Sequence, residues 1–64
     1  MIELFFQQDG ETRSVEISPE THERLKLYLW KINASLQQVV NLVYERFGDV
    51  SEELILRYLG RPGQ

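Results

Sequence analysis

Asp9-Gly10 lies between two segments, 2–7 and 12–17, in which apolar and polar residues alternate. This dipeptide between alternating segments is the strongest short-range signal for a β-hairpin, because a two-residue type I′ turn needs two residues that tolerate positive φ. Such a turn pairs Gln8 with Glu11 and thereby determines the register of both strands. The first quarter of the chain is therefore predicted to form a hairpin over residues 2–17.

The predicted register divides the side chains of the hairpin between two faces. Because successive side chains of a strand point to opposite sides, Leu4 is expected across from Val15, Ile2 across from Ile17 and Phe6 across from Arg13, on an apolar side. The opposite side is predicted to hold Phe5, Gln7, Thr12, Ser14 and the facing pair Glu3 and Glu16. Like charges directly across a ladder are unfavourable, so this second side is expected to meet water or positive charge.

A helix is predicted directly after the hairpin. Ser18 followed by Pro19 is typical of a helix start, with a capping hydroxyl and a proline at the first helical position. Glu20 and Glu23 follow in the first turns, where they favour the positive end of the helix dipole. Asn33 is suited to a left-handed stop, so the helix is expected to end at residue 32.

Two further helices are predicted in the second half. Ser35 can cap a helix whose apolar residues recur with a period of 3.6, and Gly48 closes it. Asp49 or Ser51 opens the next helix, which Gly60 ends. The apolar faces are expected at Leu36, Val39, Val40, Val43, Tyr44 and Phe47, and at Leu54, Ile55, Tyr58 and Leu59. The predicted helices are 19–32, 35–47 and 51–59, with a tail at 60–64. The chain, 1–64, is thus expected to be a single small α+β domain with the order ββααα.

The first predicted helix has two apolar faces. Leu25, Tyr28, Leu29 and Ile32 fall on one side and form a normal core stripe. Leu27 and Trp30 fall on the opposite side, one turn apart, among charged residues. A chain of 64 residues buries only about 60% of its unfolded surface and has little capacity to cover both sides of a helix. The second face therefore requires a partner chain, a second copy or the chain's own hairpin, under which Trp30 would complete a monomer core.

The composition is typical of a folded protein and contains no recognisable chemistry. The sequence has 42% hydrophobic and 27% charged residues, no cysteine and a formal net charge of −3, which is unfavourable for binding phosphates. His22 is the only histidine, and no serine has the context of a nucleophile. No enzyme activity, cofactor or metal is therefore expected. The absence of a membrane-length apolar segment and of a signal-peptide pattern predicts a cytoplasmic protein that does not bind membranes.

Residues 12–47, TRSVEISPETHERLKLYLWKINASLQQVVNLVYERF, resemble the ribbon-helix-helix repressors and antitoxins. They share an alternating strand, a proline-glutamate helix start, a left-handed stop two residues before a serine, and a second helix that ends on an aromatic residue. The resemblance implies a dimer whose paired strands enter the major groove of DNA. It also implies DNA contacts from Thr12, Ser14 and Glu16, and a phosphate held near Ser35.

A second resemblance covers residues 1–26. MIELFFQQDGETRSVEISPETHERLK is similar to the first hairpin and helix of ubiquitin-like domains, which also act by binding proteins. If residues 39–44 and 54–59 formed strands instead of helices, the chain could complete a β-grasp fold. The helical period of both segments favours helices.

These patterns predict a small, non-enzymatic protein-interaction module that forms a homodimer or binds another protein. The contact residues are expected to be Leu27, Trp30, Leu42 and Phe5, the large apolar side chains that fall outside the predicted core. Tryptophan is over-represented among the residues that dominate binding energy at interfaces. The alternative is a dimeric ribbon-helix-helix regulator or antitoxin that binds DNA through Thr12, Ser14, Glu16 and Ser35.

Overall fold

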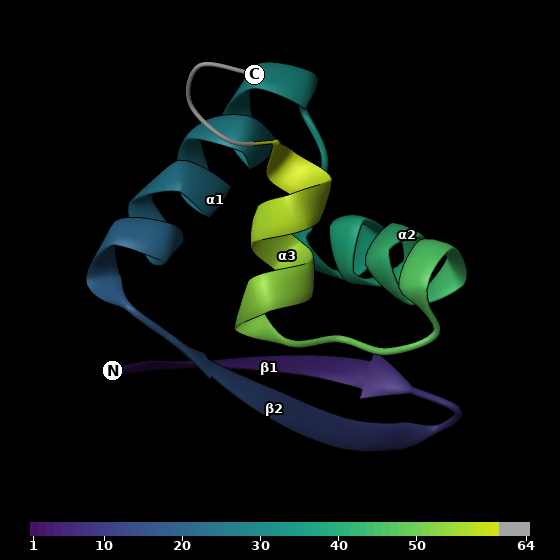
Figure 1. Ribbon diagram of the computed structural model, residues 1–64. Coiled ribbons are helices and arrows are strands. Elements are labelled where there is room, and N and C mark those ends of the chain that lie inside the picture. Colours follow the sequence, from purple (N-terminus) through teal and green to yellow (C-terminus); the bar gives the residue numbers. More distant parts are fainter. Residues whose placement is uncertain (61–64) are drawn as a thin grey trace.

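A computed structural model describes residues 1–60, in which a two-stranded antiparallel hairpin is followed by three helices (Figure 1). The elements are β1 (Ile2–Gln8), β2 (Glu11–Ile17), α1 (Pro19–Ile32), α2 (Leu36–Phe47) and α3 (Glu52–Leu59). The helices lie on one side of the hairpin, and α3 lies between α1 and α2 and contacts both helices and β2. The predicted ββααα order is confirmed. Of the predicted tail, all but Gly60 lies outside the described residues.

The register of the hairpin is confirmed. Gln8 pairs with Glu11 and the ladder extends to Ile2 and Ile17. Asp9 and Gly10 have φ angles of 54° and 79°, which are the two positive values that a type I′ turn requires. This turn type matches the natural twist of the strands, so the local sequence determines which side chains point toward the helices.

The helix boundaries follow from their capping residues. Ser18, Ser35 and Ser51 each accept a hydrogen bond from the backbone N–H three residues later, at 3.2, 3.2 and 3.3 Å. Asn33 adopts the left-handed conformation, with φ 55° and ψ 47°, and stops α1. Because residues 39–44 and 54–59 lie within α2 and α3, the β-grasp alternative is wrong.

The core lies between the hairpin and the helices. Its buried members are Leu4, Phe6, Ile17, Leu25, Val39, Val40, Val43, Val50 and Ile55. Ile32, which the helical period places in the core stripe, is instead 43% exposed. α3 contacts α1 as far along as Tyr28, whose ring packs against Tyr58, and Ile32 lies four residues, or ~6 Å of helix, beyond that contact. Ile32 is therefore left exposed because the short helix α3 ends before the last turn of α1.

A carboxylate joins the start of α3 to the start of α1. Glu52 Oε2 accepts hydrogen bonds from the Ser18 backbone N–H at 2.8 Å and from the Thr21 hydroxyl at 2.7 Å. Thr21 is only 4% exposed, and it is the buried polar residue of the described chain. These hydrogen bonds to the ionised form hold the pKa of Glu52 below its ordinary value of 4.5. Glu52 thus connects the hairpin–helix junction to α3.

The lowered pKa of Glu52 predicts a pH dependence of stability. Since the folded protein favours the ionised carboxylate, the stabilisation is complete above pH ~4.5 and is lost as the pH falls through the folded-state pKa. Glu52→Gln should therefore lower the free energy of unfolding at pH 7 and flatten its decline in acid. Urea denaturation followed by circular dichroism at several pH values measures both effects.

The control is Glu53→Gln at the next position, where the side chain is 69% exposed and the carboxylate lies 3.6 Å from the Arg57 guanidinium. This variant should retain the acid dependence of the parent chain. Equal behaviour of the two variants would contradict the assigned role of Glu52.

Candidate protein-binding surface

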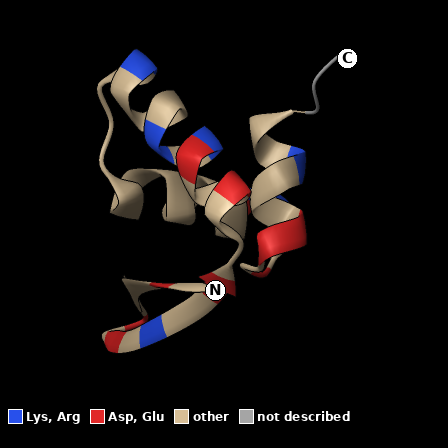
Figure 2. Ribbon diagram, turned by 90° about the vertical axis from the view of Figure 1, so that its left-hand side faces the viewer, with Lys and Arg blue, Asp and Glu red and all other residues tan. Residues whose placement is uncertain are grey.

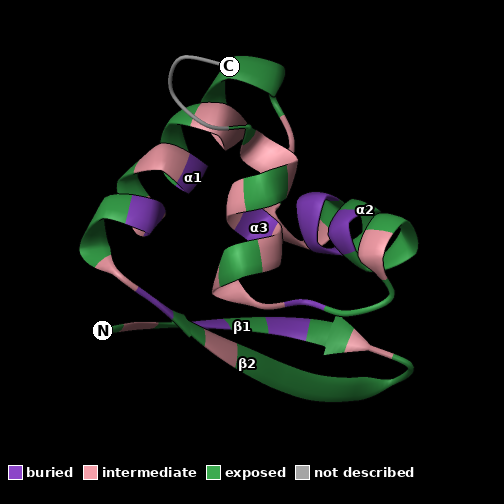
Figure 3. Ribbon diagram, in the orientation of Figure 1, coloured by how far each residue is buried: buried purple, intermediate pink, exposed green. Residues whose placement is uncertain are grey.

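Leu27 and Trp30 lie uncovered on the side of α1 that points away from the core. Leu27 is 64% exposed and Trp30 is 82% exposed. The indole does not pack under the hairpin, so the alternative in which Trp30 completes the monomer core is wrong. Both residues belong to a band of exposed side chains, which we call the α1 outer face: Glu20, Glu23, Lys26, Leu27, Trp30 and Lys31. Figure 3 shows α1 with exposed segments on the side away from α3.

Helical spacing brings these side chains together. Glu23, Leu27 and Trp30 are separated by four and three residues, so they lie along one stripe of the helix. The Lys26 ammonium is 3.1 Å from the Glu23 carboxylate, and both side chains are more than half exposed. Such exposed ion pairs contribute little to stability, so their groups are free to exchange partners.

The inner side of α1 is held against α3. Tyr28 and Tyr58 pack edge to face, with ring centroids 6.1 Å apart. Burial, followed by a hydrogen bond with Tyr58, raises the pKa of Tyr28 above its ordinary value of 10.0. Because α1 is attached along this side, the α1 outer face belongs to an ordered helix whose position in the fold is fixed.

The other two predicted contact residues lie on different elements. Phe5 is 61% exposed on the face of the hairpin opposite the helices, since its neighbours Leu4 and Phe6 are the buried ones. Leu42 is 43% exposed on α2, which contacts α3 and β1. The structure therefore brings Leu27 and Trp30 into one surface and leaves Phe5 and Leu42 outside it.

The residues that the ribbon-helix-helix resemblance assigns to DNA lie in two places. Thr12, Ser14 and Glu16 are exposed along the open face of β2, and Ser35 caps α2. The Thr12 hydroxyl accepts from Gln7 Nε2 at 2.8 Å, and the Ser14 hydroxyl donates to the Glu3 carboxylate at 3.0 Å. These side chains are thus engaged within the hairpin, beside the two carboxylates of the facing pair.

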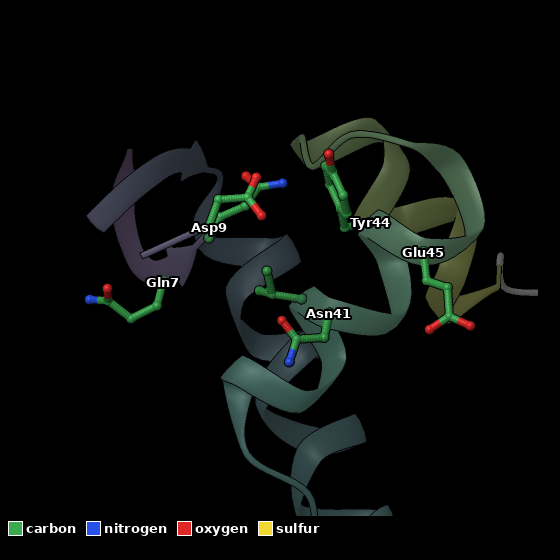
Figure 4. A pocket seen from close by; sticks show the side chains of 7 residues that line it. Gln7, Asp9, Asn41, Tyr44 and Glu45 are labelled. Atoms are coloured by element: carbon green, nitrogen blue, oxygen red, sulfur yellow. The ribbon is translucent and has the colours of Figure 1, made fainter. Parts of the chain in front are cut away.

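An open cleft of about 390 Å³ lies between the hairpin turn and α2. It is lined by Gln7, Gln8, Asp9, Val40, Asn41, Tyr44 and Glu45. Figure 4 shows Asp9 on the hairpin side and Tyr44 on the α2 side, whereas the side chains of Gln7 and Glu45 point away. Near the end of β1, the Gln37 side-chain amide donates a hydrogen bond to the Gln7 carbonyl and accepts one from the Gln7 N–H, at 2.8 Å each.

Within residues 1–60, no group of three or more histidine, cysteine, aspartate or glutamate side chains is placed to hold a metal ion. No helix in the same range is both long enough and apolar enough to cross a bilayer. Among the surfaces described, the α1 outer face combines the largest exposed aromatic side chain with an ordered backbone.

The exposure of Trp30 predicts that its removal leaves folding intact. Trp30→Ala should change the free energy of unfolding by less than about 0.5 kcal/mol at low protein concentration, because the indole makes few contacts. Leu25→Ala, on the opposite side of the same helix, should cost roughly 2–5 kcal/mol because Leu25 is only 2% exposed. Urea denaturation is followed by circular dichroism, since Trp30 is the only tryptophan. Equal losses would mean that the indole is buried.

Comparisons with known proteins do not assign the chain to a family. No family model, no curated protein and no solved structure matches the chain. The function is therefore argued from the described surface and its chemistry.

Proposed function

We propose that this protein is a non-enzymatic interaction module that binds another protein chain through the α1 outer face. The observation that carries this proposal is the exposure of Trp30 and Leu27, at 82% and 64%, one turn apart on a helix held in place from behind. Leaving these two large apolar side chains in water is unfavourable, and both are accessible to a partner.

The energetics favour association at this surface. Removing a large apolar side chain from water stabilises a complex by roughly 1.5–3 kcal/mol when burial is complete. Tryptophan residues in the centre of interfaces cost ~2 kcal/mol or more when truncated. Because α1 is ordered before binding, little backbone freedom is lost on association. Leu27 and Trp30 are thus expected to carry most of the binding energy.

The shape and rim of the surface fit a protein partner. The outer side of a helix is convex and can enter the groove of another chain or lie along a second helix. Glu20, Glu23, Lys26 and Lys31 surround the apolar pair with both signs of charge, as in the polar rim of an interface. A small ligand would instead require a concave, largely apolar site.

The open face of the hairpin is less suited to DNA. Glu3 and Glu16 face each other across the strands, beside Ser14 and Thr12. The chain as a whole carries a net charge of −3, which opposes the phosphate attraction that supplies most non-specific DNA affinity. The DNA-binding alternative thus has weaker physical support than protein binding.

Site-specific photocrosslinking in cells tests the proposal. A benzophenone amino acid in place of Trp30 should give a crosslinked protein adduct, because position 30 lies within the proposed interface. The same amino acid in place of Glu53, which is exposed on α3, should give none. Adding Leu27→Ala to the position-30 probe should reduce the adduct.

Comparing the probes at positions 30 and 53 distinguishes a specific interface from random contact. Equal crosslinking from α1 and α3 would indicate random collisions. No adduct from position 30 would argue against a protein partner at this face. The mass of the adduct identifies whether the partner is a second copy or a different chain.

A further inference from the structure

We infer that the partner of the α1 outer face is a second copy of this chain, with the two α1 helices paired antiparallel about a two-fold axis beside Leu27. This inference rests on the proposed function and adds the identity and geometry of the partner. It follows from the order of charges along α1, from the spacing of its exposed stripe and from the distribution of net charge over the chain.

The charges of the outer face change sign along the helix. Glu20 and Glu23 belong to the first half of α1, and Lys26 and Lys31 belong to the second half. Figure 2 shows this order as red toward the start of α1 and blue toward its end. An antiparallel pair places the acidic half of each helix against the basic half of the other, whereas a parallel pair would place like charges together.

A specific pairing follows when Leu27 lies on the axis. Glu23 and Lys31 are each four residues from Leu27, on opposite sides, so Glu23 of one copy faces Lys31 of the second copy. The two-fold axis repeats this contact, giving two equivalent ion pairs. The exposed Glu23–Lys26 contact within each chain is weak enough to be replaced.

The apolar residues fit the same arrangement. Two copies of Leu27 meet at the axis, and Trp30 of each chain lies one turn away, where it packs beside Leu27 of the second copy. Leu27 and Trp30 lie three residues apart on one stripe of the helix, so with Leu27 on the axis the indole lies only ~4.5 Å along the helix from Leu27 of the second copy. One isologous contact thus covers both exposed side chains.

The net negative charge of the rest of the chain disfavours dimers that form through surfaces other than α1. Pro19–Ile32 contains three basic and two acidic side chains, whereas the whole chain has a net charge of −3. The α1 outer face itself carries two acidic and two basic side chains, so two copies that approach through it meet less charge repulsion than through the acidic remainder of the chain. A helix of 14 residues is ~21 Å long, so the proposed contact is confined to one short pair of helices. The dimer is accordingly expected to be weak and sensitive to salt.

Sedimentation equilibrium over a wide concentration range at low salt tests the inference. The mass should rise from 7.6 kDa toward twice that value as the concentration increases. Trp30→Ala should raise the dimer Kd roughly 30-fold or more, as expected for a central tryptophan. Phe5→Ala removes a different exposed aromatic residue and should leave the Kd unchanged.

Charge reversal tests the antiparallel register. Glu23→Lys and Lys31→Glu should each raise the Kd about tenfold, because each places like charges together at both symmetric contacts. An equimolar mixture of the two variants should recover the parent affinity, since opposite charges face each other again in the mixed dimer. Glu53→Lys makes the same charge change on α3 and should have little effect.

The outcomes separate this inference from the proposed function. A monomer at all concentrations, combined with a position-30 crosslink to a different protein, would overturn self-association and support the interaction module. A dimer that survives Trp30→Ala, or a mixture that does not recover affinity, would overturn the α1 pairing. Circular dichroism verifies that each variant retains its helices, which is expected because all the substituted α1 positions are exposed.

Discussion

The Glu52 carboxylate is the polar contact that anchors α3, the central helix of the fold, beside the hydrophobic core. It accepts from the Ser18 backbone and the Thr21 hydroxyl, and so attaches α3 to the point where the hairpin becomes α1. The short helix α3 then lies between α1 and α2 and also contacts β2, so each larger element is positioned against it. Hydrogen bonds to an ionised group are stronger than neutral ones, and this strength suits a contact between elements that share few others.

The same arrangement explains why one side of α1 has no cover. With α3 as its neighbour among the helices, α1 is buried along one side, where Tyr28 meets Tyr58. Within residues 1–60, no other helix or strand covers the opposite side. The exposed indole is therefore a direct result of the topology, and a partner chain supplies the missing layer in our proposal.

Local features of the structure could be predicted from the sequence, but distant contacts could not. The hairpin register, the serine caps and the Asn33 stop each depend on a few adjacent residues with distinctive backbone chemistry. The helical period likewise predicted that Leu27 and Trp30 lie opposite the core stripe. The Glu52–Thr21 hydrogen bond joins residues 31 positions apart, and no local pattern indicates it. The exposure of Ile32 depends on where α3 ends. The separation of Phe5 and Leu42 from the α1 outer face depends on how β1 and α2 are placed relative to α1.

The Gln37 side chain has a consequence for how the sheet can grow. Its amide occupies the outward-facing N–H and C=O of Gln7 with the two hydrogen bonds that a neighbouring strand would make. A strand added along the outer edge of β1 would meet this amide and α2 behind it, whereas Thr12, Ser14 and Glu16 leave the outer edge of β2 uncovered. Strand addition at this end of β1 would have to displace the Gln37 amide, which disfavours growth of the sheet there.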